Sequence, residues 1–161
     1  MKLLFYLSLL AILSLSSCKE QSFNQEIPYT SLADLSKEAE FRFSIKSSSL
    51  GNYPILDDGE VRTSDYLVVI NDENAYLNEV VTKYEHPFIN FSTHTLLVLG
   101  IEYRGTVTLK PRKEGNKTIL TVIKKIPELG PQGTVFNTFS AIVPKVDSTN
   151  VIKELIEVNV K

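Results

Sequence analysis

Hydrophobic and polar residues alternate strictly over Phe41–Lys46, where two phenylalanines and an isoleucine occupy every second position. Successive side chains of a β-strand point to opposite faces, so this alternation is typical of a strand with one buried face. We expect Phe41, Phe43 and Ile45 to lie in the core. The sequence therefore predicts that a folded domain has begun by residue 41.

Two other stretches have helical patterns. Ser31 and Asp34 stand at the first and last positions of a sequence that resembles a capping box, which predicts a short helix reaching Ala39. Asn71 offers a side-chain oxygen to the first amides of a second helix, over residues 72–84. Apolar residues recur in that helix at the spacing of one face, which we expect to pack on a sheet. They are Leu77, Val80, Val81 and Tyr84.

The remaining predicted strands are aliphatic runs or alternating segments, with Pro111–Asn116 as a hairpin turn between two of them. Segments 47–60 and 126–133 are rich in serine, glycine and proline, and we interpret them as loops. This pattern predicts an α+β fold, mainly an antiparallel β sandwich or an open barrel with one packed helix. The strands are Tyr66–Ile70, Thr95–Leu99, Thr106–Lys110, Ile119–Ile126, Val135–Val143 and Ile152–Val160.

The N-terminus has the layout of a bacterial export signal. Lys2 precedes an apolar run over Leu3–Leu15, which is shorter than the roughly 20 residues that span a bilayer. Ser16 and Ser17 then precede Cys18, so Leu-Ser-Ser-Cys resembles the lipobox of bacterial lipoproteins. That resemblance implies cleavage between Ser17 and Cys18 and acylation of the Cys18 thiol. A plain secretory peptide with an incidental cysteine, or an uncleaved anchor, are the alternatives.

A lipid on Cys18 would hold the protein on a membrane, because each buried CH₂ contributes about 0.8 kcal/mol. Lys19 and Glu20 follow the cysteine, where an inner-membrane retention signal would favour aspartate, so we expect outer-membrane sorting. Whether the domain faces the periplasm or the cell surface stays open. The predicted organisation is a signal peptide over 1–17, a lipidated tether with a short helix over 18–40, and a β-rich domain over 41–161.

Composition excludes several functions. The chain has 161 residues, a formal net charge of -2 and one cysteine. No basic stripe is present, so nucleic acid is not an expected partner. With Cys18 acylated, no thiol is left for a disulfide, a redox pair or a metal site.

Two short motifs carry a family resemblance. Ile89-Asn-Phe-Ser92 precedes a strand, and Ala141-Ile-Val-Pro-Lys145 ends a later one. In this order, with a helix before them, they resemble segments of small uncharacterised Gram-negative lipoproteins, and more distantly the C-terminal domain of the PrcB subunit of a protease-stabilising complex. The resemblance covers roughly residues 65–161 and implies a compact β-rich module that binds a protein partner, with no catalytic residues to transfer. We expect a non-enzymatic module whose partner is an envelope protein, with a protease or its complex as one candidate.

The related domain has a Gly-Gly-Tyr-like hairpin loop after its central strand. Tyr103, Arg104 and Gly105 replace that loop here, and we interpret them as a candidate binding loop. An immunoglobulin-like protease inhibitor, using the loops at 101–106 and 127–134, is an alternative function.

Candidate catalytic residues are few. His86 and His94 stand eight positions apart with no third ligand at a metal-binding spacing, and Glu85 is a weak acid–base partner for His86. No Gly-x-Ser-x-Gly motif is present. We therefore expect no cofactor, no metal and no enzymatic activity, and a hydrolase using His86 or His94 is the less favoured hypothesis.

Overall fold

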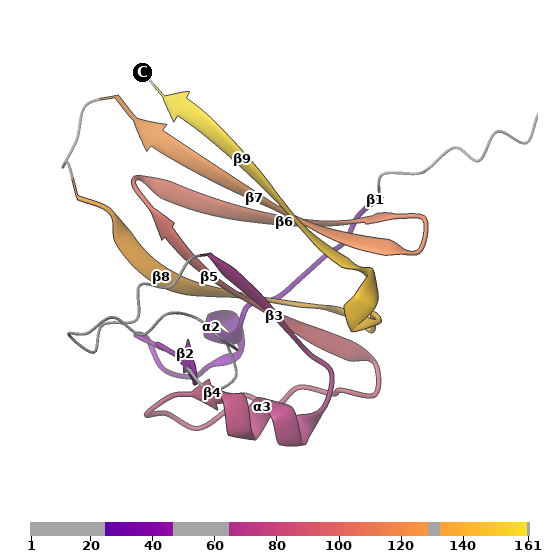
Figure 1. Cartoon of the computed structure of the whole chain (residues 1–161). Coiled ribbons are helices and arrows are strands. Elements are labelled where there is room, and N and C mark those ends of the chain that lie inside the picture. The colour runs from indigo at the N-terminus through magenta and orange to yellow at the C-terminus, as the bar shows by residue number, and fades with distance from the viewer. Residues whose placement is uncertain (1–24, 47–64, 129–132, 161) are drawn as a thin grey trace, which may run out of the picture.

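The computed structural model describes residues 25–46, 65–128 and 133–160, which form three layers (Figure 1). Sheet A has the strand order β1-β6-β7-β9 and lies on sheet B, of order β3-β5-β8. The helices α2 and α3 and the small sheet β2-β4 cover the other face of sheet B. The predicted α+β sandwich is confirmed. The elements are β1 Gln25–Glu26, α2 Leu32–Leu35, β2 Ser44–Ile45, β3 Tyr66–Ile70, α3 Glu73–Glu79, β4 Val80–Val81, β5 His94–Tyr103, β6 Thr106–Glu114, β7 Lys117–Pro127, β8 Val135–Pro144, the 3-10 turn η2 Ser148–Asn150 and β9 Val151–Val160.

β5 is the central strand of sheet B, and every residue from Thr95 to Ile101 is buried. It pairs antiparallel with β3 on one side and β8 on the other. Sheet A packs on one face of this strand and the helical layer packs on the other. A strand covered on both faces needs no polar alternation, which explains the continuous apolar run in its sequence.

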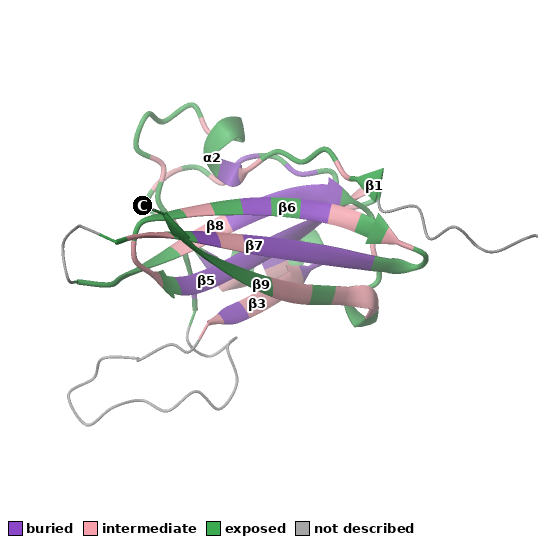
Figure 2. Cartoon of the chain, turned by 90° about the horizontal axis from the view of Figure 1, so that it is seen from above, coloured by how far each residue is buried: buried purple, intermediate pink, exposed green. Residues whose placement is uncertain are grey.

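Two hydrophobic cores fill the spaces between the three layers. Most residues of β5 and β7 are buried (Figure 2). The core between sheet B and the helical layer includes Ile45, with Phe41 and Phe43 packed against it. These three residues therefore contact the core as expected, although only Ile45 is buried. The core between the two sheets consists of Leu97, Leu99, Ile101, Leu109, Leu120, Val122, Ala141 and Val143.

The hairpin of β6 and β7 turns at Gly115, whose φ of 60° lies in the left-handed region that favours glycine. The predicted turn over Pro111–Asn116 was wrong in its extent, because β6 continues to Glu114. The carbonyl of Pro111 accepts a hydrogen bond from the amide of Ile27 at 2.9 Å, so it faces away from β7. The amide proton that proline lacks would point the same way. Pro111 therefore removes no bond from the β6-β7 ladder.

β9 pairs parallel with β7, whereas the other paired strands of the described chain run antiparallel. The chain reaches this position through β8, in the other sheet, which supplies the crossover that a parallel pair requires. On the outer face, Arg112 Nη1 donates to Glu154 Oε2 at 2.6 Å and Thr121 Oγ1 donates to the same oxygen at 2.8 Å. These two hydrogen bonds, the one from Arg112 first, lower the pKa of Glu154 and join three strands.

The first helix begins as predicted. Ser31 caps α2, its side chain accepts from the amide of Asp34, and Asp34 accepts from the amide of Ser31 in return. These hydrogen bonds from the backbone and hydroxyl of Ser31 lower the pKa of Asp34. The helix ends at Leu35 and does not reach Ala39.

The second helix differs from its prediction in cap, length and buried face. Asp72 caps α3 by accepting from Ala75 at 2.8 Å, while Asn71 Oδ1 accepts from the hydroxyl of Thr95. The predicted extension over residues 80–84 was wrong, because the β-branched Val80–Val81 pair with β2 instead. The buried residue of the helix is Tyr76, and Leu77 is 51% exposed.

The folded domain begins earlier than predicted. Residues 25–40 were assigned to the tether, yet Gln25–Glu26 pair with β6 and Leu32 is fully buried. The signal peptide over 1–17, with Ser17, and the tether residues 18–24, with Cys18, lie outside the described residues. The loop prediction for 47–60 also lies outside them.

Candidate functional site

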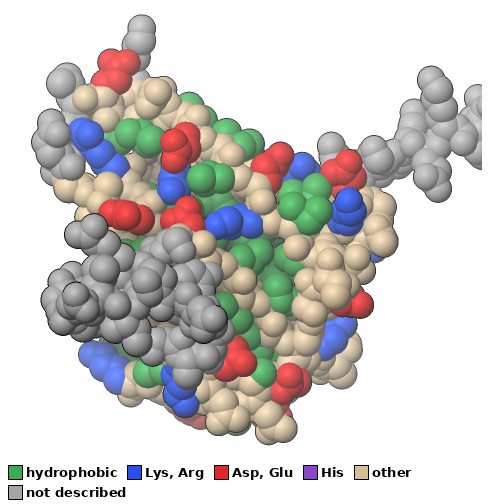
Figure 3. All heavy atoms as spheres, viewed as in Figure 1, with side chains coloured by type: hydrophobic (Ala, Val, Ile, Leu, Met, Phe, Trp, Pro, Cys, Tyr) green, Lys and Arg blue, Asp and Glu red, His purple; other side chains and the backbone are tan. Residues whose placement is uncertain are grey.

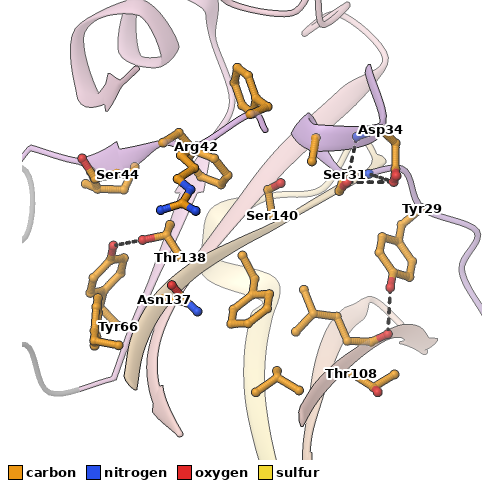
Figure 4. Close-up of a pocket in the computed structure, with 18 residues that line it drawn as sticks. Tyr29, Ser31, Asp34, Arg42, Ser44, Tyr66, Thr108, Asn137, Thr138 and Ser140 are labelled. Carbon is orange, nitrogen blue, oxygen red and sulfur yellow. Dashed lines mark hydrogen bonds between the residues drawn. The ribbon is translucent and has the colours of Figure 1, made fainter. Parts of the chain in front are cut away.

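A groove of about 940 Å³ runs along the open edge of the two sheets, where β8 of sheet B faces β6 of sheet A (Figure 4). Its volume is within the range of small-ligand and peptide sites. We call it the edge groove. Segments 29–34 and 41–45 form its outer walls, and Tyr66 of β3 extends its floor. The described residues that line it are Tyr29, Ser31, Ala33, Asp34, Phe41, Arg42, Phe43, Ser44, Ile45, Tyr66, Val107, Thr108, Leu109, Phe136, Asn137, Thr138, Phe139 and Ser140.

One side of the edge groove is a free strand edge. β8 is the last strand of sheet B, and on its outer side Ile142 exchanges backbone hydrogen bonds with Thr30. Backbone groups of alternate residues in a strand point the same way, so those of Phe136, Thr138 and Ser140 also point outward. No described residue makes a backbone hydrogen bond to these three residues on that side. The groove therefore offers a row of backbone donors and acceptors.

The N-terminal segment covers one end of this edge, at Ser140 and Ile142, and leaves Phe136 and Thr138 more accessible. After its bridge to Ile142, the chain turns into α2, and the amide of Leu32 donates to Ser140 Oγ at 2.9 Å. On the opposite wall, the Tyr29 hydroxyl donates to the carbonyl of Leu109 at 3.1 Å. These contacts fix the N-terminal segment at both walls. Among the described residues, the space between these walls is the edge groove.

Aromatic rings give the edge groove an apolar floor. Tyr66 lies across the sheet over Gly100 of β5, where any side chain would overlap the tyrosine ring. The ring therefore reaches β8, with its hydroxyl 3.4 Å from Thr138 Oγ1 and its centroid 6.0 Å from that of Phe136. Phe41 and Phe43 lie on the outer wall, with ring centroids 5.9 Å apart. Such surfaces suit apolar or aromatic side chains of a ligand.

The charged groups of the edge groove are of opposite sign and have different roles. Asp34 is engaged with Ser31 in the cap of α2. The guanidinium of Arg42 extends into the groove toward Thr138 (Figure 4). Arg42 is exposed, and it can donate to a carboxylate or carbonyl of a bound molecule. The described lining thus provides apolar surface, backbone groups and one exposed guanidinium for binding.

The candidate binding loop lies at the turn between β5 and β6, next to the edge groove. Tyr103 packs on Phe139 at 5.7 Å between ring centroids, and its hydroxyl accepts from Asn137 at 3.0 Å. Gly105 has φ 94° and lies against the backbone of β7. Tyr103 and Gly105 thus have structural roles, and binding by this loop with Arg104 stays a prediction.

The two histidines occupy separate local environments. His86 Nε2 lies 3.0 Å from the carbonyl of Val80, and its ring meets the Tyr76 ring edge-on. Burial raises the pKa of Tyr76 to about 12, and its hydroxyl donates to the carbonyl of Pro87. His94 Nδ1 lies 2.8 Å from Thr93 Oγ1. Within the described ranges, no group of three histidine, cysteine or acidic side chains could hold a metal ion. Glu85 is exposed beside His86.

Sequence reasoning missed the edge groove. The alternation over Phe41–Lys46 was interpreted as a strand, but only Ser44–Ile45 pair, and Phe41 and Arg42 line the groove instead. The glycine in the apolar run of β5 was the available signal, because a glycine inside a strand often marks a close approach of another group.

No helix in the described part of the chain is long and apolar enough to cross a membrane. On the face seen in Figure 3, acidic and basic side chains are interspersed, with hydrophobic side chains exposed between them. Comparison with known proteins found no family model, no curated protein and no solved structure that matches this chain.

Proposed function

We propose that this chain is a lipid-anchored lipoprotein of the bacterial outer membrane whose β domain binds an extended segment of an envelope protein without catalysis. The observation that supports the proposal most directly is the edge groove beside the free edge of β8. A free strand edge next to apolar side-chain pockets is how many peptide-binding domains add a strand from their ligand.

The groove supports both affinity and selectivity for such a segment. Backbone groups of Phe136 and Thr138 would pair with those of the added strand, independently of its sequence. Alternate side chains of that strand would point toward the ring of Tyr66 on one face, since strand side chains alternate. Arg42 favours a segment that carries a carboxylate at the level of Thr138.

The lipid anchor is tested by the mass of the mature protein. The membrane-extracted chain is expected to begin at a diacylglyceryl Cys18, and a Cys18→Ala variant is expected to retain residues 1–17 and no lipid. The measurement is intact-mass spectrometry of both chains, with protease shaving of whole cells to show which side the domain faces. An unmodified chain that starts at another residue would contradict the anchor and leave the groove proposal standing.

Partner binding is tested by site-specific photocrosslinking in cells. A photoreactive phenylalanine analogue at position 136 lies in the edge groove, whereas the same analogue at position 88 replaces a side chain that is 82% exposed and does not line it. We expect an adduct with an envelope protein from position 136 and none from position 88, read on a denaturing gel and identified by mass spectrometry.

A Thr138→Pro variant provides the control for strand addition. Its missing amide would point into the groove and not toward β5, so the sheet is expected to keep its ladder while the adduct is lost. Equal adducts from both positions, or an adduct unaffected by the proline, would contradict binding at the edge groove. A protease-complex subunit in the adduct would support the partner class implied by the resemblance.

A further inference from the structure

β9 is an edge strand of sheet A, beside β7 and away from β6, and most of it is exposed (Figure 2). It is ten residues long and contains no proline or glycine. Edge strands of monomeric proteins are normally short, charged or interrupted, because a free edge can pair with another chain. Five of its apolar side chains are 40–42% exposed, namely Ile152, Leu155, Ile156, Val158 and Val160.

The direction of the free backbone groups can be inferred from one contact. The carbonyl of Val160 accepts from the amide of Glu128, directly after β7, so the backbone groups of Val160 point toward β7. The backbone groups of alternate residues in β9 share that direction, so the backbone groups of the odd-numbered residues point to the free edge. Leu155 lies at the middle of this outward series. No backbone hydrogen bond from a described residue reaches the series.

We propose that β9 pairs antiparallel with β9 of a second copy of this chain, about a two-fold axis at Leu155. Such an axis joins the two A sheets into one continuous sheet, and the interface is self-complementary. In this register Lys153 of each copy faces Glu157 of the other copy, so two opposite-charge pairs form. Ile152 likewise faces Val158 on the outer surface. The proposal is independent of the edge groove and of the lipid.

Charge selects this register over its neighbours. An axis at Lys153, Glu154 or Glu157 would place like charges directly opposite each other, which destabilises a strand pair. An axis at Ile156 leaves Lys153 without an acidic residue opposite it. Only the axis at Leu155 forms two opposite-charge pairs. Glu154 needs no pairing, because Arg112 already donates to it.

Lys153 and Glu157 are already held on the face that this pairing would use. Lys153 Nζ donates to the carbonyl of Asp65 at 3.3 Å. Glu157 lies 3.8 Å from Lys124 Nζ, which also contacts Asp65 at 3.5 Å. Both charged side chains therefore lie on the same face of β9, where the pairing would bring them opposite each other.

Disulfide trapping of the full-length protein in cells tests the pairing and its register. Directly opposite residues have Cβ atoms about 5 Å apart, within reach of a disulfide, so Leu155→Cys is expected to form a covalent dimer on mild oxidation. Lys153→Cys alone is expected to form none, because its copies would lie about 13 Å apart along the strands. The double variant Lys153→Cys with Glu157→Cys is expected to restore the dimer.

The wild-type chain and a Lys113→Cys variant, which lies in β6 with β7 between it and β9, serve as controls on non-reducing gels. Equal crosslinking from Leu155→Cys and Lys153→Cys would overturn the register, and a monomeric mass of the purified wild-type protein by ultracentrifugation would overturn the dimer. A polarity-sensitive dye attached at position 155 distinguishes lipid from a second copy. If the protein is monomeric and the dye is shielded only when membranes are present, this surface binds lipid and the second copy is rejected.

Discussion

Gly100→Val is expected to lower the free energy of unfolding by about 3 kcal/mol, at the upper end of the cost of overpacking a core. Any Cβ at this position overlaps the ring of Tyr66 and lies 2.7 Å from Cζ of Phe136. Tyr66 would have to leave the sheet, which also removes the floor of the edge groove. Urea unfolding monitored by circular dichroism measures the change.

Gly133→Val is the matched control, because that glycine has no atom within 4 Å of the added Cβ. Its effect is expected to stay within about 0.5 kcal/mol. A double-mutant cycle identifies the cause: in a Tyr66→Ala background, Gly100→Ala should cost much less than it does alone. Additive effects would show that the glycine is required for another reason.

The sequence predicted the strands well where hydrophobic periodicity reports local burial. β5 is a near-continuous apolar run because packed layers cover both of its faces, and β7 carries the apolar residues Leu120 and Val122 that face the core between the sheets. The positions of both strands were predicted to within a few residues. The capping box at Ser31 was also predicted, since its hydrogen bonds join residues three apart. Interactions between residues close in sequence can therefore be predicted from the sequence pattern around them.

Pairing between distant segments left no such pattern. The parallel pairing of β9 with β7 depends on where the chain returns after β8, and alternation is the same for parallel and antiparallel exposed strands. Val80 and Val81 suit one face of a helix and also a strand, and contact with β2 decided between them. The edge groove was hidden for the same reason, because Tyr29, Arg42 and Thr138 meet only in three dimensions.

The two free strand edges differ in what surrounds them. The edge of β8 is recessed between walls with aromatic rings, which suits a single added strand. On the outer edge of β9, no described residue forms a backbone hydrogen bond, which suits a second sheet edge. This difference explains why we assign a peptide segment to one edge and a second copy of the chain to the other.

The groove wall itself depends on one buried side chain, and Leu32→Ala is expected to lower the free energy of unfolding by about 3 kcal/mol. Leu32 is fully buried in the core beneath α2, and replacing a buried leucine by alanine removes apolar contacts and leaves a cavity. The same change loosens the segment that bridges Ile142. Amide hydrogen exchange at Ile142 is therefore expected to accelerate more than exchange at Leu99.

Leu35→Ala provides a control within the same helix, because Leu35 is 43% exposed. It removes the same atoms from a partly solvated site, and its cost is expected to be below about 0.5 kcal/mol. If the two variants lost equal stability, the N-terminal segment would not be anchored through Leu32. If Leu32→Ala lost stability but kept the crosslink from position 136, strand addition at β8 would not need the outer wall of the groove. Loss of the crosslink in Leu32→Ala alone would instead link the anchoring of α2 directly to partner binding.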